Sequence, residues 1–235
     1  MALPWHTLES VDTEDGVLEL RSRAGRDFLI TIDGRVLMNS AAHGSEVALG
    51  ELACGHLSRR AGARVLVGGL GMGYTLRAVL DLLPPSGRVV VAEINPVVVA
   101  WCRGPMAGLT AGAVEDPRVV VEVGDVAALI RGCAAGGERF DAVVLDLYEG
   151  PHGGSRGRDH PLYGRQAVET ARKVLVPGGI FAVWGEDHDP GFERRLRAAG
   201  FSVACHRPGR GGARHVVYVG RSGGPGRPRG RPRPR

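Results

Sequence analysis

Apolar and polar residues follow two different patterns along the chain. In residues 1–40 they tend to alternate, most clearly in 16–21 and 28–38, and alternation is typical of strands that bury one face. Asp33-Gly34 lies within the second of these segments, and Asp-Gly between two strand-like runs is a strong signal for a tight hairpin turn. We therefore predict a small N-terminal β-hairpin unit over residues 1–44.

From residue 45 onward, short continuous apolar segments alternate with segments of helical period. The predicted strands are 64–69, 88–94, 118–123, 141–145, 180–184, 201–205 and 215–219. The predicted helices are 45–58, 74–83, 96–103, 126–133, 163–175 and 191–199. Strands that alternate with helices favour a parallel sheet, and the last two strands must pair antiparallel because no helix separates them. Residues 45–220 are thus predicted to form an α/β domain, a Rossmann-like doubly wound sheet that is mostly parallel with a C-terminal antiparallel strand.

Charge changes this picture only at the C-terminal end. The 235 residues carry a formal net charge of +5, but 221–235 contain six arginines and no acid. Without them, 24 basic residues remain against 25 acidic ones, so the body has a net charge of −1. We predict a disordered Arg/Pro/Gly tail over 221–235 that contacts polyanions weakly. The nearly neutral body argues against a broad nucleic-acid-binding face.

Cysteine spacing and hydropathy exclude other classes of protein. Cys54, Cys102, Cys133 and Cys205 form no Cys-x-x-Cys pair, so we expect no metal site and buried, reduced thiols. The N-terminal segment carries acids where a signal peptide needs a basic start. No apolar segment approaches the roughly 18 residues of a membrane span. We therefore expect a cytoplasmic protein with no membrane-spanning segment.

Candidate ligand-binding residues follow the predicted strands, at the edge where open α/β sheets bind ligands. The first strand ends in a glycine-rich turn, Gly68-Gly69-Leu70-Gly71-Met72-Gly73, which lets the backbone approach a ligand closely. The alternative is a tight strand-to-helix turn without a ligand. The second strand ends at Glu93, where an acid can accept hydrogen bonds from ribose hydroxyls or lie solvated before a helix.

Acidic residues also follow the third and fourth strands. Asp125, after Gly124, can bond the amine of an adenine or cap the next helix. Asp146 and Glu149 suit a cationic substrate, one as base and the other as anchor, or form a solvated loop pair. Several carboxylates would repel a pyrophosphate but attract a nucleoside that carries a sulfonium. The pattern therefore favours S-adenosylmethionine or a relative over a dinucleotide.

These motifs resemble the spermidine synthase (polyamine aminopropyltransferase) branch of the class I S-adenosylmethionine-dependent methyltransferase fold, over roughly residues 28–187. The family's GGGDGG motif matches 68–73, and its ribose acid matches Glu93. Its adenine-contacting GD matches Gly124-Asp125, its DSSDP loop aligns with 146–150, and its QGE resembles Trp184-Gly185-Glu186.

The resemblance implies a role for each matched residue. The residues expected to bind S-adenosylmethionine or decarboxylated S-adenosylmethionine are Gly68, Gly69, Gly71, Gly73, Glu93, Gly124 and Asp125. Asp146 would be the general base that deprotonates the attacking amine, and Glu149 would help to hold that amine. The resemblance also implies a homodimer that acts on a small-molecule amine or another cationic substrate.

The chain departs from the family at four positions. Gly71 replaces the acid that holds the donor's aminopropyl ammonium, and Leu37 replaces the hairpin glutamine. Leu49 and Trp184 stand where the family has a substrate-binding tyrosine and a glutamine. Three functions therefore stay open: aminopropyl transfer to an amine, S-adenosylmethionine-dependent methyl transfer to an unknown small molecule, and nucleoside binding without catalysis.

The segment from His152 to Gly164 is rich in Gly and Arg and also contains Asp159 and His160. It can form a lid over the acceptor or, with its two histidines and its aspartate, a metal site. The spacing matches no known metal pattern, so a flexible loop is the favoured interpretation.

Overall fold

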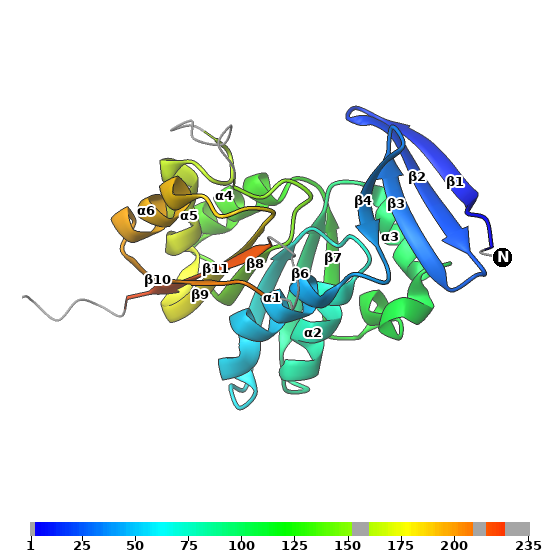
Figure 1. The fold of residues 1–235 in the computed structure, drawn as a ribbon. Coiled ribbons are helices and arrows are strands. Elements are labelled where there is room, and N and C mark those ends of the chain that lie inside the picture. The colour runs from blue at the N-terminus through cyan, green and yellow to red at the C-terminus, as the bar shows by residue number, and fades with distance from the viewer. Residues whose placement is uncertain (1–2, 152–159, 209–214, 224–235) are drawn as a thin grey trace, which may run out of the picture.

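The computed structural model describes residues 3–151, 160–208 and 215–223. These residues form two sheets, which lie side by side in Figure 1. An antiparallel sheet of four strands is formed by the N-terminal segment, and a mostly parallel sheet of seven strands lies between layers of helices. The predicted fold class is therefore confirmed.

The N-terminal sheet has its strands in chain order. They are β1 (His6–Thr13), β2 (Gly16–Arg23), β3 (Asp27–Ile32) and β4 (Arg35–Asn39). Asp33 and Gly34 join the last two strands with φ of 46° and 76°, as a tight hairpin turn with two positive φ angles requires. The hairpin prediction is confirmed, but β1 was not predicted. Most of its side chains are exposed, so no apolar alternation marks it.

The larger sheet has the strand order β10-β11-β9-β8-β5-β6-β7. Its strands are β5 (Arg64–Gly68), β6 (Arg88–Glu93), β7 (Val119–Val123), β8 (Phe140–Leu145), β9 (Leu175–Gly185), β10 (Phe201–His206) and β11 (Val216–Ser222). Only β11 runs against its neighbours, because it pairs antiparallel with both β9 and β10. The predicted antiparallel pairing of the last two strands is confirmed.

Helices cover both faces of this sheet (Figure 1). They are α1 (Gly44–Cys54), α2 (Tyr74–Leu82), α3 (Pro96–Arg103), α4 (Val126–Gly136), α5 (Arg165–Lys173) and α6 (Pro190–Ala198), with 3₁₀ turns at Gly55–Leu57, Ala107–Thr110 and Ala113–Glu115. Side chains of α1, α2 and α3 share one apolar core with the N-terminal sheet, and those of α4, α5 and α6 form a second core on the other face.

Two strand boundaries differ from the sequence expectation. Strand β9 begins at Leu175, where the sequence indicated the end of a helix, because Leu175 pairs with Phe140 before the Pro177-Gly178-Gly179 segment. Strand β11 continues to Ser222, so it contains the first two residues of the predicted tail. Residues 224–235 lie outside the described residues, so the tail and the division into domains stay predictions.

Two further expectations concern thiols and membranes. All four cysteines are unpaired, but Cys205 is exposed on β10, so the prediction of a buried thiol is wrong there. β10 is an edge strand of the larger sheet, and most of its side chains are exposed. Within the described part of the chain, no helix has the length and hydropathy that crossing a membrane requires.

The crossing of α1 over α2 depends on Gly50. This glycine is buried, and a Cβ atom there would lie 2.7 Å from the Cβ of Ala78 and 3.2 Å from the carbonyl oxygen of Thr75. Gly50 thus costs helix propensity within α1 but permits a close approach of the two helices. Gly55, at the end of α1, has no atom within 4 Å of such a Cβ.

We predict that Gly50→Ala is less stable than Gly55→Ala by about 1–3 kcal/mol, because only the first substitution overpacks a helix crossing. Chemical denaturation of both variants, each compared with the unsubstituted chain, measures this difference. Equal stabilities of the two variants would contradict the assigned role of Gly50.

Candidate active site

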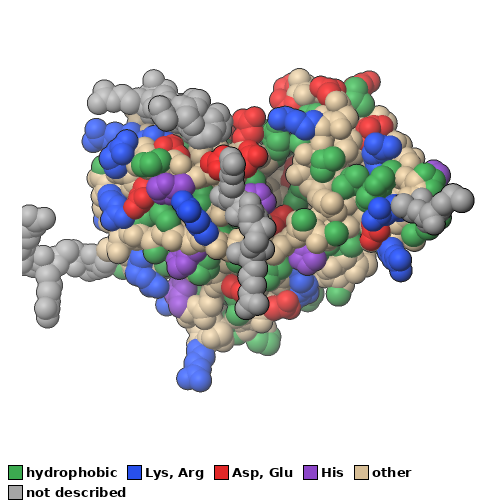
Figure 2. Space-filling model, viewed as in Figure 1, with side chains coloured by type: hydrophobic (Ala, Val, Ile, Leu, Met, Phe, Trp, Pro, Cys, Tyr) green, Lys and Arg blue, Asp and Glu red, His purple; other side chains and the backbone are tan. Residues whose placement is uncertain are grey.

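The register of the parallel strands brings the predicted site residues to one edge of the sheet. Gly68 pairs with Ala92 on one side and with Leu145 on the other. Beyond these pairs, the N–H of Asp146 donates to the carbonyl oxygen of Gly68 at 2.8 Å. After β7, the N–H of Gly124 donates to the carbonyl oxygen of Glu93 at 2.8 Å. Figure 2 shows acidic side chains gathered beside the hollow between the two parts of the molecule.

The glycine-rich turn after β5 runs directly against the loop after β8. Gly69 has a φ of 87°, and a Cβ atom there would lie 2.1 Å from the carbonyl oxygen of Asp146. No other residue type fits this contact, because both the backbone conformation and the space demand glycine. Gly73, with a φ of 83°, precedes the first residue of α2. The turn therefore leads into a helix N-terminus, where free N–H groups favour polar or anionic ligand atoms.

Glu93 is buried and rigidly held. Its Oε2 accepts a hydrogen bond from the backbone N–H of Leu70 at 2.8 Å, and its Oε1 accepts one from that of Asn95 at 2.9 Å. The side chain is only 6% exposed, so this acid is not a solvated one. Each carboxylate oxygen keeps a second acceptor site. The adjacent Ile94 is 62% exposed, which leaves an apolar side chain uncovered beside the carboxylate.

Asp125 caps α4. Its carboxylate accepts hydrogen bonds from the N–H groups of Ala127 at 2.8 Å and Ala128 at 3.2 Å. Arg131 lies 3.9 Å away, and about half of the Asp125 side chain is exposed. The capping interpretation is therefore confirmed, and a ligand amine would have to share these oxygens with the helix.

Asp146 is partly buried and points toward α2. Its Oδ2 accepts a hydrogen bond from the hydroxyl of Thr75 at 2.5 Å. Burial raises the pKa of Asp146 from its ordinary value to about 7, the Thr75 hydroxyl opposes this rise, and the negative charge of Glu46 adds to it. A carboxyl group with a pKa near neutrality can act as a proton acceptor under ordinary conditions.

Glu149 is exposed in the loop after β8, and its backbone carbonyl accepts a hydrogen bond from the Tyr163 hydroxyl at 2.7 Å. Burial raises the pKa of that phenol, and the charges of Asp146 and Glu149 raise it further. Both carboxylates thus lie near Tyr163. However, the acid that raises the pKa of Asp146 is Glu46 in the first turn of α1.

Sequence reasoning did not find Glu46, Thr75 and Tyr163. Glu46 resembles an ordinary acid near the start of a helix, and Thr75 resembles an ordinary core residue. No motif links these residues to Asp146, because they lie on separate elements that only the folded chain brings together.

A polar chain continues from Glu46 toward the end of β9. The Ser45 hydroxyl donates to Glu46 Oε2 at 2.7 Å and lies 3.1 Å from His215 Nδ1. The His215 ring meets the Trp184 indole edge to face at 5.0 Å. The indole N–H of Trp184 is buried without a hydrogen-bond partner among the described residues. Trp184 therefore places an aromatic ring beside His215, where the family pattern has a glutamine.

The other departures from the family pattern also have a structural explanation. A Cβ atom at Gly71 would lie 2.5 Å from the sulfur of Met38, so this methionine of β4 takes the space that a side chain at position 71 would need. Leu49 is fully buried, and Leu37 packs against the same core. Neither leucine offers a polar group to a ligand.

His160 closes the turn that leads into α5. Its Nδ1 accepts hydrogen bonds from the N–H groups of Leu162 and Tyr163, both at 3.2 Å, and its ring stacks on Tyr163 at 5.0 Å. His152 and Asp159 lie outside the described residues. The lid and metal interpretations of this segment therefore stay untested.

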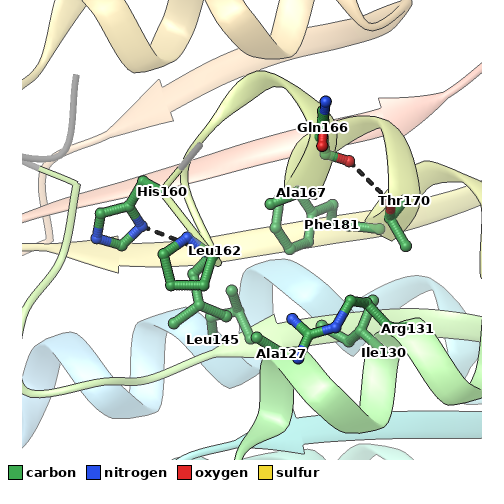
Figure 3. A pocket seen from close by; sticks show the side chains of 12 residues that line it. Ala127, Ile130, Arg131, Leu145, His160, Leu162, Gln166, Ala167, Thr170 and Phe181 are labelled. Carbon is green, nitrogen blue, oxygen red and sulfur yellow. Dashed lines mark hydrogen bonds between the residues drawn. The ribbon is translucent and has the colours of Figure 1, made fainter. Parts of the chain in front are cut away.

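A pocket of about 300 Å³ lies between α4 and α5 (Figure 3). Its lining is mostly apolar, with Ile130 and Ala127 on one helix, Ala167 on the other and Phe181 on the sheet. Its lining includes His160 but none of the residues predicted to bind the donor or to act as the base. Thr75 contacts Asp146, and the charge of Glu46 raises the pKa of Asp146, from helices on the other face of the sheet. Asp146 and the other candidate site residues at the strand ends thus do not line this pocket.

Several named proteins match about half of the chain. A polyamine aminopropyltransferase of Mycobacterium tuberculosis strain H37Rv is 36% identical over 123 residues, which is 52% of this chain and 23% of that protein. Putrescine N-methyltransferase 4 of Nicotiana tabacum is 33% identical over 123 residues, 52% of this chain and 30% of that protein. The chain thus matches only about a quarter to a third of the length of these relatives. No family model matches the chain.

Solved structures share the fold over most of the chain. Spermidine synthase from Thermotoga maritima has a TM-score of 0.69 at 18% identity and covers 93% of this chain and 73% of its own. Human methyltransferase-like protein 13, solved in complex with SAH, has a TM-score of 0.60 at 19% identity and covers 79% of this chain and 83% of its own. At these identities the likeness establishes the fold alone.

We predict that Glu93→Gln destabilises the chain by about 1–3 kcal/mol, because the amide has one acceptor oxygen for two backbone donors and turns its NH₂ group toward the other. Thermal unfolding measures the loss. Glu122→Gln, at an exposed position of neighbouring β7, is the matched control. A Glu93→Gln variant as stable as this control would contradict the assigned role of Glu93 in holding the glycine turn.

Proposed function

We propose that this chain, whose resemblance to the polyamine aminopropyltransferase (spermidine synthase) family the sequence comparison confirms, is an S-adenosylmethionine-type transferase. It moves an aminopropyl group from a decarboxylated S-adenosylmethionine-type donor to an amine, with Asp146 as the general base. The observation that carries the proposal is the Asp146 carboxyl group, which follows β8 beside the glycine turn and has a pKa near 7.

The donor's nucleoside fits the edge formed by β5, β6 and β7. Glu93 is held in one orientation and has acceptor sites left for the two ribose hydroxyls. Ile94 offers an exposed apolar surface on which a flat base can lie. The backbone of the glycine turn approaches closely enough for direct contact. By the resemblance, Asp125 would contact the adenine, and it would share its carboxylate with the N–H groups of α4 that it caps.

The acceptor fits the acidic region around Asp146. Glu46 and Asp146 attract an ammonium group, and Glu149, on the same loop as Asp146, is suited to hold the far end of a cationic substrate. The ionised carboxylate takes a proton from the ammonium and leaves a neutral amine. The amine nitrogen then attacks the methylene carbon beside the sulfonium. A C–N bond forms, the C–S bond breaks, and its electron pair goes to sulfur, which leaves a neutral thioether nucleoside.

Methyl transfer from intact S-adenosylmethionine is the second candidate. The observation that favours it is the contact of Met38 with Gly71, because the thioether takes the place where the family pattern has an acid for the donor's ammonium. A second support is that a tobacco protein named putrescine N-methyltransferase 4 is 33% identical to this chain over 123 residues. Nucleoside binding without catalysis is less well supported, since Asp146 has both the position and the pKa of a base.

The remaining expectations of the sequence stay proposals. They are a homodimer, a cytoplasmic location, and weak binding of polyanions by residues 221–235.

We expect decarboxylated S-adenosylmethionine to bind more tightly than S-adenosylmethionine when the two are compared by isothermal titration calorimetry. A clear preference for the carboxylated molecule would replace aminopropyl transfer with methyl transfer. Binding of neither donor would reject both transferase functions.

We also predict that Asp146→Asn lowers kcat for transfer by at least about 10²-fold, because an amide cannot accept the proton. The dissociation constant for the nucleoside should change little, since the ribose and base contact other residues. In the unsubstituted enzyme, kcat/KM should rise with pH through about 7 as the Asp146 carboxyl group ionises. Asp81→Asn, on the exposed side of α2, is the control. Equal loss of binding and transfer in Asp146→Asn would overturn the assignment of the base.

A further inference from the structure

Thr75 is a buried residue of α2 that contacts the proposed base directly. Its hydroxyl oxygen lies 2.5 Å from Asp146 Oδ2 and 3.1 Å from the backbone carbonyl oxygen of Glu46. The residue is 2% exposed. A threonine hydroxyl has a single hydrogen, so it can donate to only one of these two oxygens at a time. The protonation state of Asp146 decides which one receives it.

Two hydrogen-bond arrangements follow from this geometry. When Asp146 is ionised, the Thr75 hydroxyl donates to the carboxylate. When Asp146 is protonated, its own O–H donates to the Thr75 oxygen, and the Thr75 hydrogen turns to the carbonyl of Glu46. Both arrangements leave these groups hydrogen-bonded, so a proton can arrive and leave without movement of heavy atoms. The bond to the ionised form is the stronger one, because it is charge-assisted.

The other groups around Asp146 oppose its ionisation. Burial disfavours the carboxylate, and Glu46 on α1 adds a like charge. Of the other titratable groups nearby, Glu149 lies on the same loop as Asp146, and Tyr163, before α5, stays a neutral phenol because its pKa is raised. Of the three influences that determine the pKa of Asp146, only the Thr75 hydroxyl lowers it.

We propose that Thr75 is a positioning residue for the transfer reaction, which orients the Asp146 carboxyl group and favours its ionised form by donating the hydroxyl hydrogen. This inference rests on the proposed function, because it takes Asp146 to be the base. It adds a residue outside every motif of the sequence, and it explains how a carboxylate in an acidic and partly buried region stays available to accept a proton.

The test compares two substitutions at position 75. Thr75→Val keeps the shape of the side chain and removes the hydroxyl, and Thr75→Ser keeps the hydroxyl. Thr31→Val is the matched control: Thr31 is a buried threonine of the N-terminal sheet whose hydroxyl also contacts a carboxylate, that of Glu19 at 3.3 Å. The readout is kcat/KM against pH, with putrescine as the amine probe and the donor that binds more tightly.

In Thr75→Val, the midpoint of the rising limb should move up by about one pH unit, because one hydrogen bond to a charged group is lost. Activity should then fall about tenfold below the midpoint and recover at high pH. Thr75→Ser and Thr31→Val should keep the original midpoint. A uniform loss of activity at every pH in Thr75→Val, or a shifted midpoint in Thr75→Ser, would overturn the inference.

A measurement without turnover separates this inference from the proposed function. The side-chain carboxyl resonance of Asp146, assigned with Asp146→Asn, can be followed by ¹³C NMR across the same pH range. An unmoved midpoint in both Thr75→Val and Thr75→Ala, a second variant without a hydroxyl, would reject the role of Thr75. A raised midpoint in a chain that transfers nothing from either donor would reject the proposed function and leave the coupling of Thr75 to Asp146 established.

Discussion

The parallel pairing of β5 with β6 and β8 is the interaction on which the rest of the site depends. It places the ends of these strands next to one another, so that the glycine turn, Glu93 and the loop after β8 meet at one edge. The approach is so close that a Cβ atom at Gly69 would collide with the backbone of Asp146. Parallel strands also require crossovers, and the helices that provide them cover both faces of the sheet. The same constraint therefore builds the core and assembles the site.

The chemistry of Asp146 depends on helix packing as much as on its own position. Gly50 permits the close crossing of α1 and α2, and this crossing brings Glu46 and Thr75 to the carboxyl group from two different helices. The two neighbours act in opposite directions, since a like charge disfavours the carboxylate and a donated hydrogen bond favours it. The proton affinity of the proposed base is thus a property of three packed elements.

The sequence predicted most of the fold because buried parallel strands appear as continuous apolar segments, as in residues 64–69 and 88–94. It did not predict β1, whose side chains are mostly exposed and whose stability comes from pairing with β2. It also mistook Cys205 for a buried thiol, because hydropathy does not reveal that its strand ends the sheet.

By itself, the sequence determined which residues would follow the strands, and therefore that Glu93 and Asp146 would lie at one edge beside a glycine turn. That inference needs only that the strands run parallel in one sheet, which the alternation of apolar strands with helical segments predicts. Only the tertiary structure decided how each carboxyl group behaves. Glu93 is held by two backbone donors, Asp125 is engaged in capping α4, and Asp146 is tuned by Thr75 and Glu46. The physical reason is that proton affinity depends on burial and on contacts across the fold, and residues distant along the chain leave no periodic signal that connects them.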